Sequence, residues 1–127
     1  MKYIRETEKS VGHALENLKA SVARNNFGVL HVYDLKATLA DKGVDLAEEC
    51  HILEICNPMR AKEVLDADIS MNMALPCRVS VYSENGKTKI GMIRPKAMLE
   101  MLSDDPGLAK VATEVEATMI KIIDETV

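Results

Sequence analysis

The sequence is poor in aromatic residues: it has no tryptophan, one phenylalanine and three tyrosines. Proteins that bind nucleic acid use a basic surface, often together with aromatic side chains that stack on the bases. This chain of 127 residues has a formal net charge of −4, and its acidic and basic residues are interspersed. We therefore do not expect nucleic acid to be a partner.

Long apolar runs are also missing. No stretch without Asp, Glu, Lys or Arg is longer than the one from Asn25 to Tyr33, whereas a membrane-spanning helix needs about 20 mostly apolar residues. The first ten residues alternate charged and apolar side chains and contain no apolar segment of the kind found in secretory signals. These absences predict a cytoplasmic protein that does not cross a membrane.

Linkers, internal repeats and low-complexity segments are absent as well, so we predict a single domain over residues 1–127. A chain of this length can bury a hydrophobic core without disulfides or metals. Hydrophobic residues make up 47% of the chain and charged residues 28%, which is typical of globular proteins.

Helical and strand patterns follow one another along the chain. Apolar residues recur with a helical period after Ser10 and after Asp105, and the pair Asn85–Gly86 is a strong signal for a β-hairpin turn. We expect strands over 2–6, 28–35, 51–55, 78–82 and 87–93, and helices over 11–25, 37–42, 58–66, 95–102 and from 106 onward. The prediction is an α+β fold: a mixed, mainly antiparallel sheet with helices packed on one face and an amphipathic C-terminal helix.

The three cysteines, Cys50, Cys56 and Cys77, are the most informative polar feature. An odd number of cysteines in a cytoplasmic chain does not indicate a disulfide framework. There is no Cys-x-x-Cys pair, so the usual zinc-ribbon and thioredoxin signatures are absent. Inert core cysteines, a reactive thiol and an unusual metal site remain as alternatives.

Cys56 directly precedes a predicted helix start, with Asn57 as the N-cap and Pro58 at the first helical position. Free amides and the dipole at a helix start favour a thiolate, so we expect a lowered pKa for the Cys56 thiol. Alternatively, Cys56 fills space between strand and helix as a small apolar residue.

Cys77 begins a later strand, directly after a proline. If this strand pairs with the strand that ends at Cys56, both sulfur atoms can face one pocket. There they could form a transient disulfide, share a soft metal ion or hold a sulfur atom. The alternative is that both are core cysteines that never meet.

Other candidate ligands are weaker. Cys50 lies about 20 Å from Cys56 along a straight strand, too far to share an ion. Glu54 lies about 7 Å from Cys56 on the same strand face, as a base, a ligand or merely a solvated charge. Lys36 follows a strand in a loop and could meet an anionic ligand, although surface lysines are common.

Methionines near Cys77 suggest one further kind of metal site. Met71 and Met73 precede it, and thioether and thiolate sulfur are ligands that Cu(I) prefers. The chain has eight methionines and few aromatics, and methionine commonly fills gaps in a core. We therefore interpret these two residues as core.

Three sequence blocks resemble a known family. They are ILEICNPMRAKEVL with its Cys56-Asn57-Pro58, ALPCRVSVY with its Leu75-Pro76-Cys77, and NGKTKIGMIRPKAML. From the first helix onward the chain is similar to the domain-of-unknown-function-302 family, although Glu54 and Cys50-His51 depart from its usual pattern. The resemblance implies a compact α+β domain and a homodimer, and it implies no established activity.

The leading hypothesis is a small cytoplasmic homodimer that binds a small ligand, metal or sulfur species at a pocket including Cys56 and Cys77. Asn57 is expected to orient the adjoining loop, and Glu54 or Lys36 to line the rim. A thiol redox enzyme with Cys56 as nucleophile and Cys77 as resolving thiol is the first alternative. A structural or interaction module without chemistry is the second. The ligand, any cofactor and any metal stay open.

Overall fold

The structure is a computed structural model that describes residues 1–127, and it confirms the predicted α+β fold. The elements in chain order are β1 (Lys2–Thr7), α1 (Val11–Arg24), β2 (Gly28–Asp34), α2 (Leu35–Asp41), β3 (Cys50–Cys56), α3 (Pro58–Ala67), the 3-10 helix η1 (Ile69–Ala74), β4 (Cys77–Glu84), β5 (Lys87–Ile93), α4 (Pro95–Leu102) and α5 (Pro106–Thr126).

The five strands form one sheet in the order β1-β5-β4-β3-β2. Every neighbouring pair is antiparallel. β1 and β2 follow one another in the chain but lie at opposite edges, so α1 crosses one face of the sheet to connect them. The predicted turn at Asn85–Gly86 joins β4 to β5, and both of its residues have positive φ angles, of 53° and 79°.

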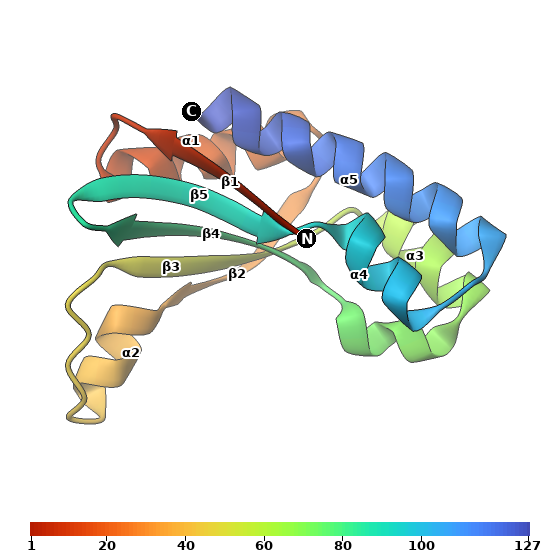
Figure 1. The fold of residues 1–127 in the computed structure, drawn as a ribbon, viewed down its shortest axis with the longest axis horizontal. Helices are drawn as coiled ribbons and strands as arrows, with labels where there is room; N and C mark the ends of the chain where they lie inside the picture. The colour runs from red at the N-terminus through yellow and green to blue at the C-terminus, as the bar shows by residue number, and fades with distance from the viewer.

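One face of the sheet forms the core. Alternate strand residues such as Leu53, Val79 and Ile90 are fully buried there, because successive side chains of a strand point to opposite faces. The amphipathic helices α1 and α5 cover this face (Figure 1). The Ser21 hydroxyl links the two helices by donating a 2.9 Å hydrogen bond to the Ile122 carbonyl. The other face, which includes Ile4 and Ile93, is open.

The remaining helices lie at the two ends of the sheet. α3, η1 and α4 gather beyond the end where β3 finishes and β4 begins, and α2 lies at the opposite end (Figure 1). α3 and α4 both pack against α5. No helix has the combination of length and apolar character needed to cross a membrane.

Two local features differ from the predictions. α2 begins at Leu35, two residues before the predicted start, because the Asp34 carboxylate accepts a 3.0 Å hydrogen bond from the Ala37 amide and caps the helix. η1 is not predicted at all. It begins in the same way, with Asp68 accepting from the Ser70 amide at 3.0 Å.

Candidate functional site

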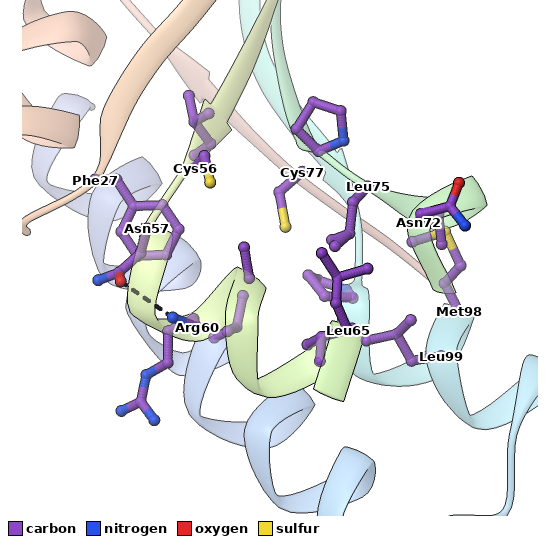
Figure 2. Close-up of a pocket in the computed structure, with 17 residues that line it drawn as sticks. Phe27, Cys56, Asn57, Arg60, Leu65, Asn72, Leu75, Cys77, Met98 and Leu99 are labelled. Carbon is purple, nitrogen blue, oxygen red and sulfur yellow. Dashed lines mark hydrogen bonds between the residues drawn. The ribbon is translucent and has the colours of Figure 1, made fainter. Parts of the chain in front are cut away.

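A cavity of about 260 Å³ lies at the end of the sheet, where α3, η1, α4 and α5 converge. Its walls come from the end of β3, the start of β4 and one side of each of these helices (Figure 2). Twelve of its 17 lining residues are hydrophobic. It is therefore an apolar cavity built from segments that are far apart in the sequence.

The two predicted cysteines both line this cavity. Cys56 is the last residue of β3, Cys77 is the first residue of β4, and Cys77 pairs with Ile55 across the antiparallel ladder. Figure 2 shows both sulfur atoms pointing from the strand ends toward α3. Both cysteines are free and partly buried. The pairing of β3 with β4 therefore brings together two thiols that are separated in the sequence.

Cys77 is held as a neutral thiol. Burial raises its pKa from an ordinary value of 9.0 to about 11, and negative charge on nearby Cys56 adds to the effect. A buried thiolate loses its hydration and finds no opposite charge here, so the protonated form is favoured. At neutral pH Cys77 acts as a small, polarisable, uncharged part of the wall.

Asn57 has the N-cap role that the sequence predicts. Its side-chain oxygen accepts hydrogen bonds from the amides of Met59 at 3.0 Å and Arg60 at 3.2 Å. The Ala61 amide donates to the Asn57 carbonyl at 2.9 Å, and Pro58 has no amide hydrogen. The first-turn amides of α3 are thus already hydrogen-bonded within the chain.

Arg60 is the one charged residue that lines the cavity. Its guanidinium forms ion pairs with Glu114 and, at 3.3 Å, with Glu63. Figure 2 shows this group directed away from the two sulfur atoms. The positive charge is compensated at the rim, and the interior stays without charge.

Glu54 and Lys36 lie outside the cavity, in contrast to the sequence hypothesis that places them at its rim. Glu54 faces the open side of the sheet, where it accepts a 2.8 Å hydrogen bond from the Tyr33 hydroxyl and lies 3.8 Å from Arg78. Lys36 donates to the Ala47 carbonyl at 3.1 Å. Strand alternation predicts that Cys56 and Glu54 lie on the same face of β3. Cys56 is the last residue of the strand and lies beside the cavity, so its surroundings differ from those of Glu54.

The metal alternatives find little support in the side-chain positions. No group of three or more His, Cys, Asp or Glu residues is placed to hold a metal ion. Met71 is buried and only 5% exposed, as the core interpretation predicts. That interpretation is wrong for Met73, which is 83% exposed. Cys50 begins β3 opposite Tyr82, at the strand end remote from Cys56.

Several wall residues are not among the sequence candidates. Phe27 precedes β2, Ala61 and Leu65 lie on α3, Met98 lies on α4 and Val115 lies on α5. For the four helical residues the sequence signal is the apolar periodicity of the helices, which predicts burial but does not distinguish a packed core from the wall of a cavity.

The comparisons with known proteins agree with this architecture. A family model described as "Domain of unknown function DUF302" matches residues 3–126. The chain is also similar to the crystal structure of an uncharacterised conserved DUF302 protein from Bacillus stearothermophilus, with a TM-score of 0.94 and 33% sequence identity over 99% of this chain and 98% of that one. None of the curated proteins matches the chain.

Proposed function

The chain belongs to the DUF302 family, whose function is unknown, and we propose from its cavity that it binds a small, uncharged, mainly apolar molecule beside the thiols of Cys56 and Cys77. The observation that carries the proposal is the lining of the cavity, which is mostly hydrophobic and has one charged residue, itself paired with two glutamates. An ionic ligand would lose its hydration there without gaining an opposite charge.

The volume sets the size of the ligand. A dry apolar cavity of about 150 Å³ is sufficient to hold benzene, and this one measures about 260 Å³. The space suits a molecule somewhat larger than benzene, such as an alkylbenzene or a medium-chain alcohol. Ligand sites are typically apolar clefts with a few well-placed polar groups. Here Asn57 and Asn72 lie at the wall, and both of their amide nitrogens already donate to backbone carbonyls of the chain.

The thiols fit the role of a soft contact surface better than that of a redox pair. A resolving thiol has to ionise in order to attack, and Cys77 has its pKa raised to about 11. A neutral thiol packs against apolar and aromatic groups. Three free cysteines also agree with a reducing compartment, so we place the protein in the cytoplasm.

Titration with two probe series tests the proposal: linear alcohols from butanol to decanol, and benzene to butylbenzene, followed by heteronuclear NMR. We expect saturable shifts in the methyl signals of Val64, Leu65 and Val115, with the tightest binding at an intermediate probe length. Ala61→Phe, which fills the cavity, should weaken binding at least tenfold. Ala20→Phe, on the exposed side of α1, is the matched control and should leave binding unchanged.

Two results would oppose the proposal. One is the absence of saturable shifts for every probe, and the other is equal binding by the Ala61→Phe and wild-type proteins.

A further inference from the structure

The open face of the sheet has a hollow, centred on Ser80 and Gly91, that we call the open-face hollow. Its nine lining residues come from β1, β3, β4 and β5. The helices α1 and α5 cover the opposite face of the sheet (Figure 1). The hollow measures about 310 Å³, within the range of roughly 300–1,000 Å³ that is typical of ligand pockets.

The shape of the hollow follows from one row of residues that crosses four strands. Ile52 pairs with Ser80, Ser80 pairs with Gly91, and Gly91 pairs with Ile4. Directly paired residues of neighbouring strands point to the same face of a sheet. The two small residues therefore lie between two isoleucines. A Cβ atom on Gly91 would lie only 3.1 Å from Cγ1 of Ile4, so glycine allows that isoleucine to pack closely over the strand.

The walls of the hollow are apolar and accessible. Ile4 is 45% exposed and Ile93 is 51% exposed, and Ile52 lies at the opposite wall. Apolar side chains that gather on an open surface, with polar groups around them, commonly mark a site of interaction. The hollow thus offers an apolar floor to a ligand that remains partly in contact with water.

Two cations lie at one end of this floor. Lys2 pairs with Ile93 across the β1–β5 ladder. The β4–β5 ladder pairs Ser80 with Gly91, and continuing its register by two residues places Arg78 level with Ile93 on the other side. Lys2 and Arg78 therefore flank Ile93 at a backbone separation of about 10 Å, two strand spacings. Their long side chains can both reach one anion held between them.

The charge of these two residues is poorly compensated. Lys2 takes part in none of the ion pairs of the chain. The Arg78 side chain is 65% exposed, and its one carboxylate neighbour is Glu54 at 3.8 Å. Lys87 and Lys89, further along the same face, each form ion pairs with glutamates. No carboxylate lines the hollow, so its charge is positive.

We propose that the open-face hollow binds a small carboxylate with a medium-length apolar chain, of which octanoate is an example. The carboxylate lies between Lys2 and Arg78, and a guanidinium can bind it through two parallel hydrogen bonds. The chain covers Ile93 and the floor between Ile4 and Ile52. This site is separate from the uncharged cavity and takes a ligand of different chemistry. A second copy of the chain fits the hollow less well, because two such faces would bring the same cations together.

NMR of protein labelled at the isoleucine methyl groups tests the proposal with two probes, octanoate and octanol, which share a chain length and differ in charge. Octanoate should shift the signals of Ile4, Ile52 and Ile93 in a saturable way. Its affinity should fall as sodium chloride is raised, because salt screens exposed charges. Octanol should bind at these three signals at least tenfold more weakly. Its binding in the cavity is read separately from Val64 and Leu65.

Substitutions separate the two parts of the site. Lys2→Gln and Arg78→Gln should each weaken octanoate binding at least fivefold, and Ser80→Leu should weaken it by filling the floor. Lys87→Gln is the matched control, because it makes the same change of charge on the same face outside the hollow. It should leave octanoate binding unchanged. The dispersion of the methyl spectrum checks that each variant is folded.

Three results would overturn the proposal. The first is the absence of saturable isoleucine shifts with octanoate, including the case in which these signals respond only to protein concentration because a second copy covers the hollow. The second is equal affinity of octanoate and octanol at these signals. The third is an equal loss of octanoate binding in Lys87→Gln and Arg78→Gln. Failure of octanol to bind in the cavity would leave the proposal for the hollow standing.

Discussion

At the scale of single residues, Cys77 connects the fold to the chemistry of the cavity. It begins β4 and lines the cavity, and burial raises the pKa of its thiol to about 11. The same burial that makes it a good apolar contact makes it a poor nucleophile, because only the thiolate attacks. A test of its ionisation therefore distinguishes a binding wall from a redox pair.

Alkylation by iodoacetamide should show this directly. At pH 8, Cys77 of the folded protein should react about 100-fold more slowly than Cys77 of the unfolded protein, because a pKa two units higher leaves about one hundredth of the thiolate. The rate should rise with pH up to about 11. Mass spectrometry of the modified peptides measures each cysteine separately. Equal alkylation rates of Cys77 in the folded and unfolded protein would contradict the raised pKa of its thiol.

The charge on Cys56 contributes a smaller part of this shift. Burial is the larger cause of the raised pKa of Cys77, and repulsion by Cys56 is the second. Cys56→Ser should therefore move the alkylation profile of Cys77 to slightly lower pH without restoring an ordinary profile. A Cys77 that titrates normally in this variant would mean that the thiol pair, and not burial, controls the site.

Asn57 holds the wall next to Cys56. Its side chain caps α3 through two amides and donates a 3.3 Å hydrogen bond to the Asn26 carbonyl. Asn57→Ala should lower the free energy of unfolding by about 1 kcal/mol, as is usual for a lost N-cap. Asn57→Asp keeps an oxygen that accepts from both amides, so it should lower the free energy of unfolding by less. Urea denaturation measures both variants, and a loss for Asp equal to that for Ala would argue against the cap.

At the scale of elements, the effect on stability of replacing a glycine by alanine depends on where the glycine lies. Gly86 has a φ of +79° in the β4–β5 turn, whereas Gly12 lies in the first turn of α1 with open space around it. Gly86→Ala should cost about 1–2 kcal/mol because the left-handed region disfavours a Cβ atom. Gly12→Ala should stabilise the protein by about 0.5 kcal/mol through helix propensity. Thermal denaturation of the two variants should shift in opposite directions, and a shift of the same sign would contradict this account.

Most elements are predictable from the sequence because their ends carry local signals. Asn57–Pro58 begins α3, Asn85–Gly86 forms the hairpin turn and Pro95 begins α4. Each of these signals spans only a few residues of the chain. η1 follows a weaker signal, a single aspartate cap on a six-residue segment. The start of α2 depends on Asp34 ending a strand and capping a helix at the same point, which periodicity alone does not reveal.

At the scale of the whole molecule, the site is only partly predictable. That Cys56 and Cys77 line the same cavity depends on the register of β3 against β4, and no local pattern specifies this pairing. The cavity also needs α4 and α5, which come from the last third of the chain. Strand alternation wrongly predicts that Glu54 lies at the site, because alternation takes no account of where β3 ends relative to the helices.

A crystal structure of the protein grown with butylbenzene tests the central claim most directly. We expect the ring and its alkyl chain to occupy the cavity in contact with Ala61, Leu65 and the sulfur atoms of Cys56 and Cys77. The same crystals of Ala61→Phe should show no bound probe there. A cavity filled by ordered water, or butylbenzene bound only elsewhere on the protein, would contradict the claim that this site takes an apolar molecule.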